Sequence, residues 1–91
     1  MFVRIKENGY DINGNHLFRV FAYKEMEKEH LNLIGQYRPI GRNEAKNLLS
    51  FGKINKDNSC TTQLYKNEIL QRLKEKARTL YINENVLFVF E

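Results

Sequence analysis

The chain has 91 residues, of which 42% are hydrophobic, and its 15 lysines and arginines outnumber 11 aspartates and glutamates, which gives a net charge of +4. This length predicts one domain, residues 1–91, with one modest core, and it excludes an active-site cleft between two lobes. The charge is too small for a histone-like arm. It is concentrated in residues 35–56, which hold five cations against Glu44 alone.

Two strands with a period of two are predicted at residues 2–7 and 16–24. Because successive side chains of a strand point to opposite faces, one face is apolar and the other is aromatic and basic. The apolar set is Val3, Ile5, Phe18, Val20 and Ala22, and the mixed set is Phe2, Arg4, Lys6, Leu17, Arg19, Phe21 and Tyr23.

Two Asn-Gly pairs lie between these strands, at residues 8–9 and 13–14. Either pair can form the type I′ turn of a hairpin, because both residue types tolerate a positive φ. The apolar alternation slips between Ile5 and Tyr10, so we predict a β-bulge at Gly9 and the turn at Asn13-Gly14.

A third strand is predicted over residues 31–38 because leucines and Tyr37 alternate there with other residues. Pro39 ends it, since proline lacks the donor that a central strand needs. In this register Ile34 and Arg38 join the mixed face, and Tyr37 lies on the apolar face.

Two helices and a last strand follow. Apolar spacing predicts a short helix over residues 42–51, ended by Gly52, and a long helix from a cap at Thr61 or Thr62 to about Ile82. Residues 86–90 are apolar on both faces and form the final strand. The element order is therefore βββααβ.

These elements predict an α+β fold: a four-stranded mixed or antiparallel sheet with both helices packed on one face. The helices then leave the mixed face open. An aromatic and basic surface of this kind is typical of an interface. We expect Arg4, Lys6, Arg19, Phe21 and Tyr23 to bind a partner there. The alternatives are that Phe21 and Tyr23 pack against residues 25–30, or across a homodimer formed by the open faces.

A second candidate region is the basic segment 35–56. Its part from Gly35 to Ala45 resembles the strand-to-helix junction of integrase arm-binding domains, in which a three-stranded sheet enters the DNA major groove. The spacing to Glu44 is longer here and the usual threonine cap is absent. Arg38, Arg42 and Lys46 are predicted to gather near a helix N-terminus, where phosphate or carboxylate binds, although an ordinary solvated basic turn is the alternative.

Catalytic, cofactor and metal sites receive little support. Cys60 is the single cysteine, so no internal disulfide is possible, and its predicted place before the long helix would lower its thiol pKa. With His16 and His30 it makes three ligands, one fewer than a structural zinc site needs. We expect no enzyme activity, cofactor or metal. The sequence also lacks a signal peptide or an apolar run that could span a bilayer, which predicts a cytoplasmic protein without a membrane partner.

Three functional hypotheses remain. The first is a small non-enzymatic protein that docks stoichiometrically on a protein or protein–nucleic acid complex, resembling in size and lack of motifs the phage or mobile-element inhibitors of host defence or nucleic-acid machinery, anti-CRISPR proteins among them. The second is an accessory or regulatory protein that contacts nucleic-acid phosphates directly through its sheet and residues 35–56. The third is an enzyme with Cys60 as its nucleophile.

Overall fold

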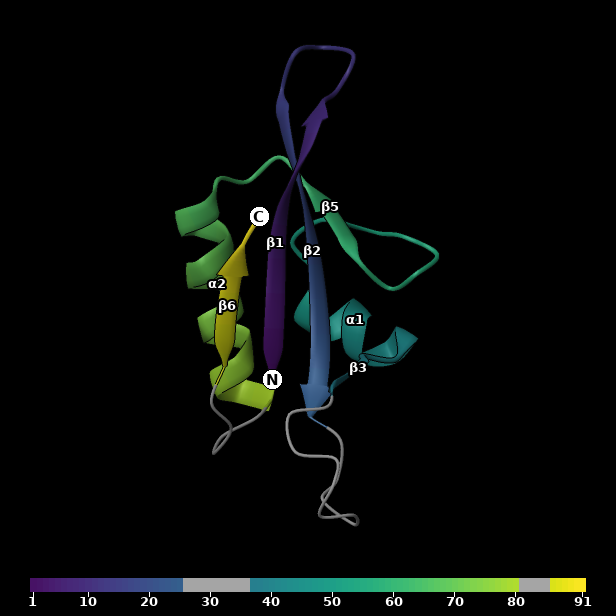
Figure 1. Cartoon of the computed structure of the whole chain (residues 1–91), viewed down its shortest axis with the longest axis vertical. Helices are drawn as coiled ribbons and strands as arrows, with labels where there is room; N and C mark the ends of the chain where they lie inside the picture. Colours follow the sequence, from purple (N-terminus) through teal and green to yellow (C-terminus); the bar gives the residue numbers. More distant parts are fainter. Residues whose placement is uncertain (26–36, 81–85) are drawn as a thin grey trace.

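The computed structural model describes residues 1–25, 37–80 and 86–91, which form two helices and a six-stranded mixed sheet (Figure 1). The elements are β1 (Phe2–Tyr10), β2 (His16–Glu25), β3 (Tyr37–Pro39), α1 (Arg42–Leu48), β4 (Lys53–Ile54), β5 (Cys60–Thr62), α2 (Lys66–Leu80) and β6 (Leu87–Phe90). The predicted α+β class is confirmed. The predicted number of four strands is wrong, because β4 and β5 lie between the two helices.

A long antiparallel hairpin of β1 and β2 forms the centre of the sheet, and the other strands flank it (Figure 1). β6 lies beside β1 and runs parallel to it, with residues 87–90 opposite residues 2–5. The far side of β2 is shared, since β5 pairs with residues 18–20 and β3 with residues 23–25. β4 continues the sheet beyond β5.

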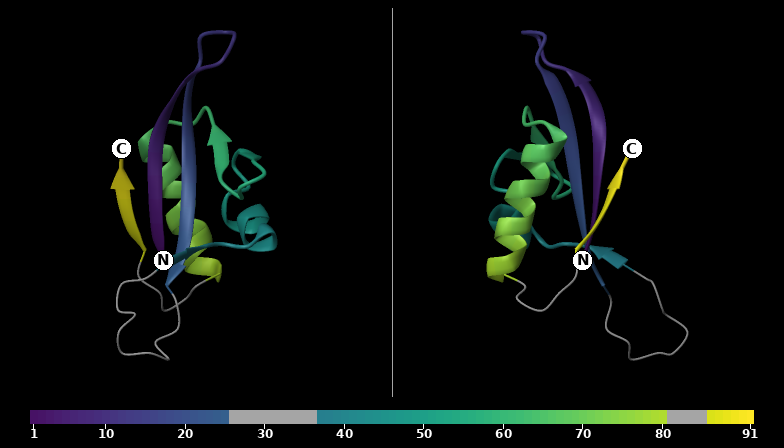
Figure 2. Two further views of the ribbon diagram at one scale, coloured as in Figure 1. Left: turned by 45° about the vertical axis from the view of Figure 1, so that its right-hand side comes forward. Right: turned by 90° about the vertical axis from the view of Figure 1, so that its left-hand side faces the viewer.

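The register of the hairpin confirms the predicted division of its two faces. Val3 lies opposite Ala22 and Ile5 opposite Val20, whereas Arg4 lies opposite Phe21. Both helices lie on the same side of the sheet (Figure 2). The buried residues of that side are Val3, Ile5, Phe18, Val20 and Ala22 from the hairpin, with Leu48, Leu49, Ile69 and Leu73 from the helical segments. One core therefore sits between the sheet and the helices.

The hairpin contains the predicted bulge, but its turn is centred on residues 12 and 13 and not on Asn13-Gly14. The β1–β2 register shifts between Glu7 and Tyr10, and Gly9 has a φ of +73°. The turn is closed by a hydrogen bond of 3.1 Å from the Gly14 N–H to the Asp11 carbonyl oxygen. A type I′ turn would need a positive φ at Asn13, but Asn58 is the one non-glycine residue with positive φ in the described segments. The predicted turn type is therefore wrong.

The start of the long helix differs from the prediction. Thr61 and Thr62 do not cap it but lie in β5, and α2 begins at Lys66. Cys60 and Thr62 point into the core and are buried, and β-branched threonine fits a pleated strand. Strands of three and two residues are too short to show a period in the sequence, which is why β5 and β4 were not expected.

Gly52 is needed for close packing rather than for ending a helix, because α1 stops at Leu48 and not at residue 51. A Cβ atom added at Gly52 would collide with the Cys60 sulfur and would lie 2.5 Å from the Thr61 carbonyl oxygen and 3.0 Å from the Thr62 Cβ. The segment after α1 can therefore approach β5 only if it has no side chain at this position.

Replacing Gly52 with alanine is expected to lower the free energy of unfolding by about 1–3 kcal/mol, the usual cost of overpacking a tight site. Gly41→Ala is the matched control, because an added Cβ there meets no atom within 4 Å. Its one expected effect is that alanine caps the N-terminus of α1 less well than glycine. Urea unfolding curves measure both effects. Equal destabilisation by the two substitutions would contradict the close contact of Gly52 with β5.

Candidate functional site

The candidate site is the open face, which we define as the side of the sheet that points away from α1 and α2 (Figure 2). It carries the predicted mixed set from β1 and β2, confirmed by the register in which Phe2, Arg4 and Lys6 lie opposite Tyr23, Phe21 and Arg19. β6 adds two apolar residues. Leu87 and Val89 pair with Phe2 and Arg4 and therefore share this face, and both are exposed.

Phe21 lies at the centre of the open face between two guanidinium groups. The Arg4 Cζ is 5.2 Å and the Arg19 Cζ 5.1 Å from the centroid of its ring, which is within cation–π range. Each arginine comes from a neighbouring position of the hairpin, because Arg4 is opposite Phe21 across the strands and Arg19 precedes it by two residues. The sheet thus places the Phe21 ring between two guanidinium groups on its surface, and we call these three residues the arginine stack.

Both arginines of this stack are held by carboxylates from other elements. Arg4 forms a bidentate ion pair with Glu91, with Nε–Oε1 and Nη2–Oε2 distances of 2.7 and 2.8 Å. Arg19 contacts Asp57 at 2.5 Å. The hydrogen bonds with Glu91 raise the pKa of Arg4, and the same interaction lowers the pKa of Glu91. The cations are therefore oriented and partly neutralised before any partner arrives.

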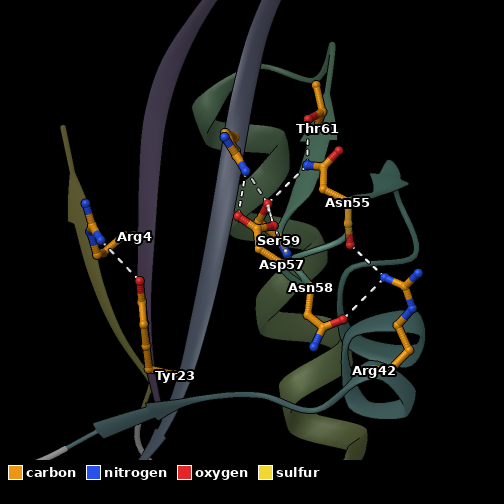
Figure 3. A network of polar contacts seen from close by, with 9 residues as sticks. Arg4, Tyr23, Arg42, Asn55, Asp57, Asn58, Ser59 and Thr61 are labelled. Carbon is orange, nitrogen blue, oxygen red and sulfur yellow. Dashed lines mark hydrogen bonds and ion pairs between the residues drawn. The ribbon is translucent and has the colours of Figure 1, made fainter.

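An aromatic group extends the open face toward β3. The ring of Phe2 has its centroid 5.8 Å from that of Tyr23 and 5.4 Å from that of Tyr37. The Tyr23 hydroxyl accepts a hydrogen bond of 3.1 Å from Arg4 Nη1 (Figure 3). This contact joins the aromatic group to the arginine stack, so Arg4, Arg19, Phe21 and Tyr23 belong to one network.

The predicted register of the third strand is wrong by one residue. Arg38 pairs with Lys24, which points to the helix side, where its Nζ lies 3.9 Å from Glu44 of α1. Arg38 is thus on the helix side, and Tyr37 takes the open face. The leucine alternation that misled the prediction falls on residues 31–36, which lie outside the described residues. Ile34 also lies outside the described residues. So do residues 26–30, which belong to the segment 25–30 that was the alternative packing partner of Phe21 and Tyr23; Glu25 itself lies in β2.

The loop of residues 55–59 supplies the carboxylate for Arg19 and is itself rigidly bonded (Figure 3). The buried Ser59 hydroxyl accepts hydrogen bonds from Arg19 Nε and Asn55 Nδ2, both at 3.0 Å, and donates one to Asp57. Asn55 Nδ2 also bonds Thr61 Oγ1 at 2.9 Å. This polar network holds the Asp57 carboxylate beside the open face.

Within the basic segment, the structure shows one cation, Arg42, bound by its own chain. Arg42 donates a hydrogen bond of 2.6 Å to the Asn55 carbonyl oxygen and one of 3.3 Å to Asn58 Oδ1 (Figure 3). The Arg42 guanidinium therefore connects α1 to the 55–59 loop, and these hydrogen bonds compete with binding of a phosphate. Lys46 is exposed on α1, and Arg38 is exposed on β3.

Cys60 is not the activated thiol that the sequence suggested. It lies in β5, fully buried, and burial raises its pKa to about 12. His16 packs its ring against Tyr10 and Phe18, while His30 lies outside the described residues. In the described parts of the chain, no three His, Cys, Asp or Glu side chains come close enough to hold a metal ion. The helices described there include none with the length and apolarity to cross a bilayer.

Comparisons with known proteins add no assignment: no protein-family model matches the chain, and neither does any curated protein or solved structure. The site therefore rests on its own geometry.

Iodoacetamide at pH 8 is expected to leave Cys60 unmodified in the folded protein and to alkylate it after denaturation, because the buried thiol is neutral and inaccessible. Intact-mass spectrometry measures the modification. Rapid alkylation of the native protein would contradict the buried position and reopen the hypothesis of a nucleophilic thiol.

Acid is expected to weaken the 55–59 loop through Asp57. Hydrogen bonds from Ser59, and then the charge of Arg19, hold its pKa below the ordinary 3.8. Because folding lowers this pKa, the ionised carboxylate stabilises the folded state above about pH 4, and this contribution is lost as pH falls further. Asp57→Asn should therefore lower the Tm at pH 7 and converge with wild type in acid. Glu68→Gln on α2 controls for the loss of one charge. A Tm difference that does not change with pH would contradict the assignment.

Proposed function

We propose that this chain is a non-enzymatic protein that docks stoichiometrically, through its open face, on a protein or on the protein part of a protein–nucleic acid complex. Small proteins of phages and mobile elements that inhibit host defence or nucleic-acid machinery bind in this stoichiometric way, and the size of the chain fits such an inhibitor. The observation that carries the proposal is Phe21 held between two oriented guanidiniums beside Phe2, Tyr23 and Tyr37.

The composition of the open face supports a protein partner. Aromatic residues and arginine are enriched where proteins bind one another, and their truncation is often the most costly in an interface. The ion pairs with Glu91 and Asp57 fix the two arginines in advance, so less side-chain entropy is lost when a partner binds. Exposed Leu87 and Val89 extend this surface with apolar area.

Direct phosphate binding by this face has less support. A phosphate approaching Arg4 or Arg19 would have to displace Glu91 or Asp57, and it would be repelled by the remaining carboxylate. Nucleic-acid binding would depend instead on cations such as Lys6, Arg38 and Lys46, which are exposed. In the homodimer alternative, the open faces of two copies would pack together, and the cations of one face, Lys6 among them, would lie against the same cations of the other.

The test is capture of partners from the native host with immobilised wild-type protein, followed by purification of the captured protein and titration calorimetry. We expect one-to-one binding that Phe21→Ala weakens by roughly 30-fold or more, the effect of a residue at the centre of an interface, and that Arg19→Glu also weakens. Arg72→Glu on the exposed side of α2 is the matched charge control and should leave binding unchanged.

Circular dichroism of each variant separates loss of binding from loss of folding. Equal binding by wild type, Phe21→Ala and Arg19→Glu would overturn the proposal. Gel shifts with DNA and RNA at two salt concentrations test the alternative of direct nucleic-acid binding. For each phosphate contact on duplex DNA, log K falls by about 0.9 when the salt concentration rises tenfold. Affinity with that dependence, lost in Lys46→Glu but kept in Phe21→Ala, would favour the nucleic-acid function.

A further inference from the structure

In the part of the chain that the structure describes, β6 forms one edge of the sheet, and no strand pairs with its outer side. Among the described residues it pairs with β1 alone. The Leu87 N–H bonds the Met1 carbonyl oxygen at 2.9 Å and the Glu91 N–H bonds the Ile5 carbonyl oxygen at 2.8 Å. Because the bonding direction alternates along a strand, the N–H and C=O groups of Phe88 and Phe90 point away from β1.

This edge lacks the features that usually prevent strand addition. Natural sheets block exposed edges with lysine, proline or a bulge, but residues 87–90 contain neither a charge nor a proline. Three of the four side chains are exposed, namely Leu87, Val89 and Phe90. Leu87 and Val89 lie on the open face, while Phe90 lies on the helix side, where the Lys66 Nζ is 5.5 Å from its ring centroid.

α2 lies on the helix side of the sheet (Figure 2), and its two flanks differ in charge. The flank toward α1 lines a groove of about 350 Å³ and includes Arg72, Glu75 and Lys76. At about 100° per residue, Lys74 and Arg78 lie on the opposite flank, toward β6, and both are exposed. The second acidic residue of the helix, Glu68, lines a different hollow together with Lys66 and Glu7, beside His16 and Phe18.

We propose that the outer edge of β6 is a β-augmentation site for an extended acidic segment of a partner protein, added antiparallel to β6. Residues of the added strand opposite Phe88 and Phe90 point to the helix side, toward Lys66, Lys74 and Arg78, and acidic residues fit there. The intervening residues lie beside Leu87 and Val89, and apolar residues fit there. The recognised pattern is therefore an alternation of acidic and apolar residues over about six positions.

Charge distinguishes this occupant from a second copy of the chain. Another β6 offers no acidic residue in positions 87–90. Pairing two copies edge to edge would also bring the second α2, with its own Lys74 and Arg78, against the first. The inference shares Leu87 and Val89 with the proposed docking of the open face, but it depends on backbone pairing at the edge and on the charge of α2, which that docking does not use.

Fluorescence anisotropy with a labelled octapeptide of alternating valine and glutamate tests this proposal on the full chain. We expect saturable binding, little binding of the corresponding valine and lysine peptide, and an affinity reduced about tenfold by the double substitution Lys74→Glu and Arg78→Glu. The matched control, Arg72→Glu with Lys76→Glu on the α1 flank, should change the affinity by less than twofold.

Methylated peptides distinguish backbone pairing from attraction between charges. In an antiparallel pair the residues opposite Phe88 and Phe90 direct their own N–H groups toward β6, so N-methylation of the glutamates should abolish binding and N-methylation of the valines should not. Equal binding by both methylated peptides, or equal effects of the two double substitutions, would overturn the proposal. These results do not depend on Phe21, so the failure of either proposal can be recognised separately.

Discussion

The alternation of side chains in the β1–β2 hairpin is the constraint on which the rest of the structure depends. Val3, Ile5 and Val20 are fully buried against the helices, which obliges Arg4 and Phe21, one residue away, to point to the other side. A slip of one residue would exchange the two faces. The hydrophobic core and the candidate site are thus two results of one register, and the bulge at Gly9 confines the irregularity to the end of the hairpin.

The open face is stabilised by residues from distant parts of the sequence. Glu91 follows the last strand and Asp57 belongs to a loop between β4 and β5, yet each holds an arginine of the central hairpin. Their half-exposed ion pairs add little to stability on their own. Their greater effect is geometric, because they keep the guanidiniums over Phe21. A surface that is ordered by its own chain can bind a rigid partner with less loss of conformational freedom.

The sequence was sufficient for features that depend on local periodicity. The two faces of residues 2–7 and 16–24, the bulge at Gly9 and the final strand follow from alternation and glycine position. It was insufficient where tertiary contacts decide. β5 has only three residues and is a strand because β2 pairs with it, and Tyr37 rather than Arg38 shares the open face because of the β2–β3 register. The carboxylate partners Asp57 and Glu91 gave no signal, since nothing local relates them to Arg19 and Arg4.

The parallel pairing of β1 with β6 has a consequence for biosynthesis. β1 acquires its second neighbour only when residues 87–90 have also left the ribosome, because β6 pairs with residues 2–5. Until then the backbone N–H and C=O groups on one side of β1 lack the hydrogen-bond partners that β6 supplies. Contacts between residues so far apart in the sequence form slowly. Completion of the sheet therefore comes late in the synthesis of this domain, after its helices and its other strands have emerged.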